Sequence, residues 1–238
     1  MNTVELLKSI LQNEQPFWAA QFEDWVRSSR RFRTFAETYR DKIHKKLRTA
    51  QNEAGLLDLF FELETAYRLL EDQRFTVEYE KFGLLKSRAP DFTVAFRVNM
   101  PFNLEVTRLR TPQADSLAPD ELANLVARKV IDSVSDKLGQ MRSGAVNLLL
   151  IISALAVADE QLAALMHGLR LSAEQRQEIF FAQSGYKDAR EFLHDFQGLS
   201  AIICRSLDTN QTAYWANSLA KHPVPKELFN ALQKTLVA

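Results

Sequence analysis

The sequence predicts an α/β protein in which helices flank a central mixed sheet. Short runs between residues 75 and 110 alternate apolar with polar residues, which is the two-residue period of a strand with one buried face. Two predominantly apolar runs, at 147–153 and 199–206, have the composition of buried strands. Apolar residues at helical spacing precede, separate and follow these runs, so the strands are expected to lie between layers of helices.

Helices are predicted first, over residues 2–50 and again over 56–70. The earlier segment carries two apolar stripes, separated at Pro16. The later one is too crowded with leucine and phenylalanine to be a surface helix. We therefore expect a helical extension followed by a buried helix.

Three alternating strands are predicted next, at 75–81, 91–97 and 102–110. A connection at 83–90 leads into the second of them, and a hairpin at 99–101 joins the second to the third.

A helix is then expected from Pro119 to about Met141. Asp120 and Glu121 lie in its first turn, where negative charge favours the helix dipole. The first of the two predominantly apolar strands follows it.

The remainder is predicted to be a helical insertion, one more strand in the same sheet, and a C-terminal helix. A turn at 221–225 leads into that last helix. We expect one domain over residues 1–238, divided as follows: an N-terminal helical extension at 1–50, a core at 54–156, the insertion at 157–198, and the final strands with the C-terminal helix at 199–238.

Composition is typical of a soluble globular protein. The chain has 238 residues, of which 46% are hydrophobic and 25% charged, and Cys204 is its only cysteine, so a disulfide framework is excluded. Neither a signal peptide nor an 18-residue apolar stretch is present, and we expect a cytoplasmic protein without a membrane span. The oligomeric state is left open.

The net charge is zero, but it is unevenly distributed. Residues 21–50 hold nine basic against four acidic side chains, whereas residues 51–80 hold two against eight. One interpretation is a basic arm that contacts nucleic-acid phosphates beside an acidic metal-binding cleft. The other is that the two segments pack against each other or are solvated. The candidate phosphate contacts are Arg30, Arg31, Arg33, Lys45 and Lys46.

Two carboxylates lie on the polar faces of adjacent predicted strands. Asp91 begins the second strand, and Glu105 lies within the third, where Asn103 and Thr107 share its face. Neighbouring strands can bring Asp91 and Glu105 together, and a divalent cation with oxygen ligands would relieve their repulsion. Mg²⁺ or Mn²⁺ is the expected cofactor.

At these residues the sequence resembles the PD-(D/E)XK nuclease superfamily, whose fold is called restriction-endonuclease-like. Its signature is Pro-Asp at the start of one core strand and an acidic-x-Lys on the next; here Pro90-Asp91 and Glu105-Val106-Thr107 take those places, with Thr107 replacing the lysine. The predicted order of helix, three strands, helix and strand is that of the superfamily core. The resemblance implies metal-dependent phosphodiester hydrolysis, with the metal held by Asp91, Glu105 and the backbone carbonyl of Val106.

The same resemblance implies further site residues on two helices. Superfamily members commonly carry a glutamate on the helix before the first core strand; we assign it to Glu62, which shares a face with apolar residues and would bind a second ion or orient water, and expect Glu64 to be exposed. Lys137 is the candidate to replace the missing lysine, and Gln140, three residues later, would position the phosphate or that lysine. The plainer alternative is that these side chains are simply solvated.

Other enzyme classes have no support in the sequence. The four histidines are not clustered as zinc ligands, and no nucleophile elbow, phosphate loop or dinucleotide-binding glycine motif is present. Two functions from different classes remain: a divalent-metal-dependent nuclease, or a protein of the same fold that has lost catalysis and binds a nucleic acid or another protein.

Overall fold

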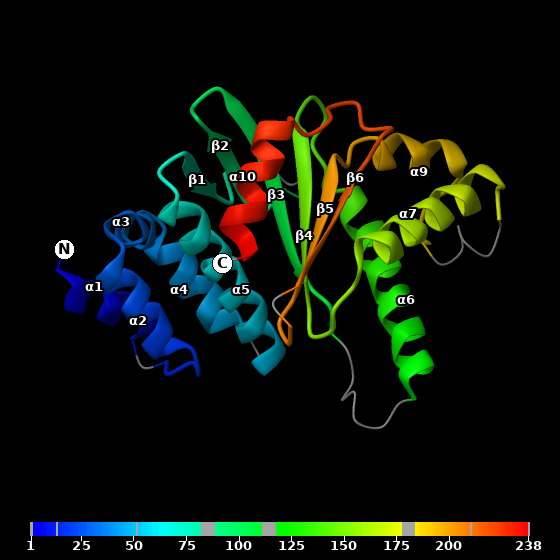
Figure 1. Ribbon diagram of the computed structural model, residues 1–238. Coiled ribbons are helices and arrows are strands. Elements are labelled where there is room, and N and C mark those ends of the chain that lie inside the picture. The colour runs from blue at the N-terminus through cyan, green and yellow to red at the C-terminus, as the bar shows by residue number, and fades with distance from the viewer. Residues whose placement is uncertain are drawn as a thin grey trace.

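A mixed sheet of six strands, flanked by helices, forms the centre of the molecule (Figure 1). The computed structural model describes residues 2–12, 14–50, 52–81, 89–110, 118–177, 184–209 and 211–237. The strands are β1 (Phe75–Tyr79), β2 (Phe92–Phe96), β3 (Met100–Arg108), β4 (Val146–Ser153), β5 (Ala201–Ser206) and β6 (Thr212–Ala216). They lie in the sheet in the order of the chain. The predicted class, an α/β protein with a mixed sheet, is confirmed.

Strand directions follow from the connections. β1, β2 and β3 are antiparallel neighbours, whereas β3, β4 and β5 run parallel and are joined through helices, as parallel crossovers require. β6 returns antiparallel to β5. The pairing of β2 with β3 ends at Phe92 and Leu104, so the last part of β3 extends beyond its neighbour.

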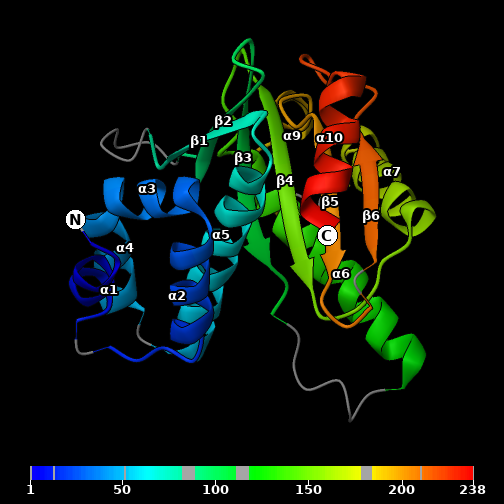
Figure 2. The same cartoon turned by 60° about the vertical axis from the view of Figure 1, so that its left-hand side comes forward.

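One face of the sheet is covered by α5 and α10, with the N-terminal helices stacked outside α5 (Figures 1 and 2). The helices on this side are α1 (Thr3–Leu11), α2 (Ala19–Ser28), α3 (Arg30–Thr38), α4 (Arg40–Thr49), α5 (Glu53–Glu71) and α10 (Lys226–Val237). Phe102, Leu104 and Val106 of β3 face this layer. Side chains of Ser29 and Asn52 cap α3 and α5 by accepting backbone N–H groups of their first turns.

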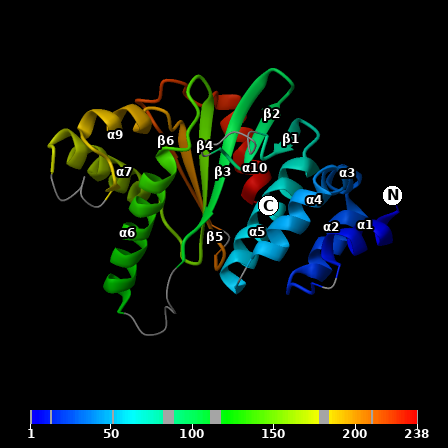
Figure 3. The same ribbon diagram turned by 180° about the vertical axis from the view of Figure 1, so that it is seen from behind.

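The other face carries a separate hydrophobic cluster. The helices on this side are α6 (Pro119–Leu138), α7 (Asp159–Glu174) and α9 (Ala189–Phe196) (Figure 3). They pack on Leu149 and Ile151 of β4 and on Ile202 and Cys204 of β5. The helical region expected between the last two buried strands therefore covers one face of the sheet.

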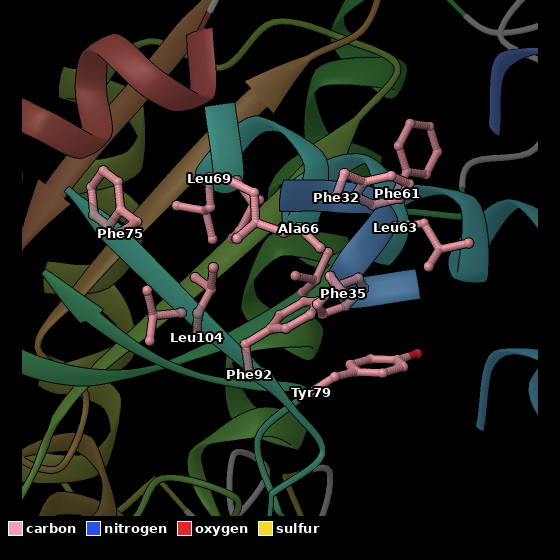
Figure 4. Close-up of a cluster of buried hydrophobic side chains, with 14 of the residues drawn as sticks. Phe32, Phe35, Phe61, Leu63, Ala66, Leu69, Phe75, Tyr79, Phe92 and Leu104 are labelled. Carbon is pink, nitrogen blue, oxygen red and sulfur yellow. The ribbon is translucent and has the colours of Figure 1, made fainter. Parts of the chain in front are cut away.

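Aromatic rings connect the N-terminal helices to the sheet. Trp25 of α2 stacks on Tyr67 of α5, with ring centroids 5.1 Å apart. Tyr79, at the end of β1, stacks on Phe92 at 5.2 Å and also contacts Phe35 of α3. In Figure 4 the hydroxyl of Tyr79 points away from this cluster. The packing thus fixes the end of β1 against α3 and α5.

Several element boundaries differ from the predictions. The turn between β2 and β3 is at 97–99, two residues earlier than expected, and Arg97 and Val98 adopt positive φ there. α6 ends at Leu138, so Gln140 lies in the turn beyond it. β1 ends at Tyr79, and residues 82–88 of the expected connection lie outside the described residues.

The region after β5 is organised by buried polar side chains. Asn217 donates from its amide to the carbonyls of Phe196 and Leu199, each at 2.8 Å. Ser200 donates to the carbonyl of His222 at 2.6 Å. These bonds tie the chain around 217–222 to the turn that precedes β5. Among the described residues, no helix is both long and apolar enough to cross a membrane.

Candidate metal centre

Asp91, directly before β2, and Glu105 of β3 meet where β2 begins and β3 continues beyond it. The backbone N–H of Val106 donates to Asp91 Oδ2 at 2.9 Å, and the backbone N–H of Asp91 donates to Glu105 Oε2 at 3.2 Å. Each carboxylate is therefore held by the backbone beside the other. The expectation that adjacent strands bring the two residues together agrees with this geometry.

Glu62 approaches the same place from α5. Its Oε2 accepts a hydrogen bond from the hydroxyl of Tyr79 and lies 2.7 Å from Lys46 Nζ of α4. Lys46 also lies 2.8 Å from Oε1 of Glu80, and its ammonium is 4.8 Å from the centroid of the Tyr79 ring. A lysine from the N-terminal helices is thus part of the acidic cluster.

Lys137 approaches from the other face of the sheet. It lies in the last turn of α6, and its ammonium forms an ion pair with Oε1 of Glu105. The side chain of Glu105 is only 4% exposed, whereas that of Lys137 is 25% exposed. Lys137 therefore reaches the buried carboxylate while keeping access to solvent.

A cleft of about 310 Å³ opens over these groups. Glu62, Asp91, Val106, Thr107 and Lys137 line it. The remaining lining residues are Asp58, Phe61, Arg108 and Arg110. Thr107 lies in the cleft wall but supplies no charge, whereas Lys137 supplies a positive charge in the same cleft.

Burial raises the pKa of the acidic groups. The pKa of Asp91 rises to about 7, first because the group is desolvated and second because Glu105 is a neighbouring negative charge. Glu62 reaches a pKa of about 7 through burial and the charge of Asp91, although Lys46 opposes this rise. Burial also raises the pKa of Glu105 against the effect of Lys137. Ionising this cluster is therefore costly unless a cation is added.

The donor set suits Mg²⁺ or Mn²⁺. Both ions prefer oxygen ligands, and Mg²⁺ usually takes one or two carboxylates while keeping several waters. Asp91 and Glu105 supply the carboxylates. The N–H of Val106 faces Asp91. Because the N–H and C=O of one strand residue point to the same side, the carbonyl of Val106 also faces this side of β3, beyond the last residue pair of β2 and β3. Across the described residues no group of three or more His, Cys, Asp or Glu side chains is placed to hold a metal ion.

Most of the site residues predicted from the sequence line one cleft, but not all. Glu62, Asp91, Glu105, Val106 and Lys137 are brought together. Gln140 is not among the lining residues; because α6 ends before it, the helical spacing that placed it beside Lys137 does not apply.

The neighbouring glutamate on α5 corrects one prediction. Glu64 was expected to be exposed, yet it is buried and forms ion pairs with Arg205 of β5 and Arg68. The expectation was wrong because α5 is covered on more than one side, by the sheet and by the N-terminal helices.

The basic segment divides into internal and exposed side chains. Arg31 donates to the carbonyls of Leu70, Asp72 and Phe75 and so closes the end of α5. Arg31 and Lys46 both bond to groups of the acidic segment. These two contacts agree with the interpretation that the basic and acidic segments pack against each other. The other three predicted contacts are Arg30 and Lys45, which are exposed, and Arg33, which is half-buried.

Sequence reasoning missed several groups around the cleft. Asp58 of α5 holds Arg108 at 3.0 Å and Arg110 at 2.5 Å, and all three line the cleft. Arg108 points toward α5, but the cleft spans the end of the strand and includes it. The available sequence signal was the pair Arg108 and Arg110, two residues apart and directly after Thr107.

Comparison of the chain with protein-family models, with curated proteins and with solved structures returns no significant match.

Proposed function

We propose that the protein is a divalent-metal-dependent nuclease of the PD-(D/E)XK type. The observation that carries the proposal is that Asp91 and Glu105 lie side by side where β2 begins, with Lys137 ion-paired to Glu105. Asp91 and Lys137 line one cleft, and the buried carboxylate of Glu105 is ion-paired to Lys137 beside it. Two carboxylates with raised pKa values next to an ammonium suit the chemistry of a phosphodiester substrate.

The topology supports the proposal independently. The chain runs from α5 through β1, β2 and β3 to α6 and β4. This is the order expected for a restriction-endonuclease-like core, and the carboxylates lie at the positions on β2 and β3 that the motif requires.

Each side chain then has a defined task. Asp91, Glu105 and the carbonyl of Val106 would hold the ion, and Mg²⁺ or Mn²⁺ bound there would supply Lewis acidity and lower the pKa of a water molecule. Lys137 stabilises negative charge that develops on the phosphate, in place of the motif lysine. Glu62 uses the oxygen not engaged by Lys46 and Tyr79 to orient the attacking water.

Arg108 and Arg110 are proposed to bind the sugar–phosphate backbone. The side chain of Arg110 is 63% exposed, so it can leave Asp58 for a phosphate without being desolvated first. The side chain of Arg108 is only 15% exposed and is held by Asp58 and the carbonyl of Ala54, so it contacts the backbone of the substrate only where that backbone enters the cleft.

A second function, binding by a catalytically inactive protein of the same fold, is favoured by one observation. Glu62 and Glu105 are each already paired with a lysine, which partly neutralises the cluster without a metal. In that case the cleft binds nucleic acid or protein but cleaves nothing.

A cleavage assay separates the two functions. Supercoiled DNA and single-stranded RNA are incubated with the protein and Mn²⁺, and Asp91→Ala must abolish any cleavage. Thr107→Lys restores the motif, and Thr107→Gln is the uncharged control of similar length. Cleavage by wild type supports the nuclease. No cleavage by wild type with any divalent metal, together with cleavage by Thr107→Lys alone, would establish the inactive form.

A further inference from the structure

Lys46 is the one group of the acidic cluster that comes from the N-terminal helices. α4 is anchored by buried Ile43 and Leu47, which fix the helix against its neighbours. The side chain of Lys46 is 28% exposed and extends to the end of β1. A buried ammonium is costly unless negative charge surrounds it.

The carboxylates around Lys46 are positioned before any ligand arrives. Nζ lies 2.7 Å from Glu62 Oε2 and 2.8 Å from Glu80 Oε1. Glu80 has a φ of 45°, a strained value for a non-glycine residue, and its N–H donates to the carbonyl of Asp91 at 2.8 Å. The strained turn thus holds Glu80 beside both Lys46 and Asp91.

We infer that Lys46 takes the place of a second divalent cation, so that the centre binds one metal ion only. The inference rests on the proposed function and deepens it, because it fixes how many ions the centre uses and makes α4 part of the site.

The bonds of Glu62 leave little capacity for a second ion. Its Oε2 already accepts from Lys46 and from the hydroxyl of Tyr79. A second ion between Glu62 and Glu80 would have to displace the ammonium or lie beside it, and two like charges at such distances repel strongly in a buried site.

The charge of the cluster agrees with one ion. Glu62, Glu80, Asp91 and Glu105 carry four negative charges when ionised, and Lys46 and Lys137 carry two positive charges. Asp58, Arg108 and Arg110 of the same cleft add one further net positive charge, which leaves a net charge of −1. One divalent cation therefore already makes the cleft slightly positive, and a second would raise that charge to +3 before substrate phosphate binds.

The test counts bound Mn²⁺ by calorimetry and by electron paramagnetic resonance, without substrate. The wild-type protein is expected to bind one ion per chain. Lys46→Gln keeps a hydrogen-bond donor but removes the positive charge. This variant is expected to bind two Mn²⁺ ions, the second at least tenfold more tightly than any second ion binds to wild type. Lys46→Arg and the exposed-site control Lys45→Gln are expected to bind one.

Each outcome decides between defined alternatives. Two ions on wild type, or one on folded Lys46→Gln, would overturn the inference while leaving the nuclease proposal intact. No ion on wild type would overturn both. Circular dichroism checks that each variant folds. If Lys46→Gln does not fold, the number of ions bound by wild type and by Lys46→Arg decides the question. Two ions on either of these proteins would overturn the inference.

Discussion

Two glutamates on α5, two residues apart, form buried ion pairs with opposite consequences. Glu64 lies between Arg205 and Arg68, so one carboxylate faces two guanidinium groups and is away from the cleft. Glu62 lies with three other carboxylates and only two lysines, and it lines the cleft. A cluster whose charges are compensated within the chain stabilises the fold. A cluster with excess negative charge needs a cation from outside.

A substitution at Glu64 tests the difference between the two ion-pair clusters most directly. Glu64→Gln leaves the buried guanidinium of Arg205 without its carboxylate, and we expect a loss of unfolding free energy on the order of 3–5 kcal/mol. Mn²⁺ binding by the folded fraction should be unchanged. Urea unfolding and calorimetry measure the two quantities. Glu62→Gln is the matched variant, and a similar loss of stability there would remove the distinction between the two sites.

Lys137 provides the next largest effect. Lys137→Ala should lower the cleavage rate by roughly 10²–10³, about 3–4 kcal/mol, because the ammonium acts mainly in the transition state. Mn²⁺ affinity should stay near that of wild type, whereas Asp91→Ala loses both. Single-turnover cleavage and Mn²⁺ titration separate these effects. Activity that survives Lys137→Ala would transfer the role to Arg108 or Arg110.

The raised pKa values predict an unusual pH dependence without metal. Folded Asp91 and Glu62 keep their protons up to about pH 7, whereas the unfolded chain releases them near pH 4. Unfolding therefore releases protons in this window, and the contribution of these groups to stability falls as pH rises from about 4 to about 7. Asp91→Asn should become more stable relative to wild type by a few kcal/mol over that range. Chemical denaturation at several pH values tests this, and a constant difference would contradict it.

The smallest effect concerns the exposed cations. If Arg110 contacts a phosphate, Arg110→Ala should reduce the log–log salt slope of nucleic-acid binding by about 0.7–0.9. Arg31→Ala should leave the slope unchanged, because Arg31 is bonded to backbone carbonyls of the chain. Equal changes in both variants would contradict this assignment, which fluorescence anisotropy at several salt concentrations can test.

Local patterns were sufficient for β1 to β5 and for the central carboxylates, but they gave no bounds for β6. Alternation marked β1, β2 and β3, and polar residues within those runs drew attention to Asp91 and Glu105. The role of Lys46 was not predictable, because it depends on how α4 packs against α5 and β1. Glu64 was misplaced for the same reason: a helical wheel assumes one buried face, and α5 has more than one. Gln140 depended on where α6 ends, which its sequence left uncertain by one turn.

The most direct test of the central claim is a crystal structure with Mn²⁺, using anomalous scattering to locate the ion. The account predicts one anomalous peak between the carboxylates of Asp91 and Glu105, with ligand distances of roughly 2.0–2.6 Å. Its absence at saturating Mn²⁺, or a peak elsewhere with these two carboxylates unchanged, would contradict a metal centre where β2 begins beside β3.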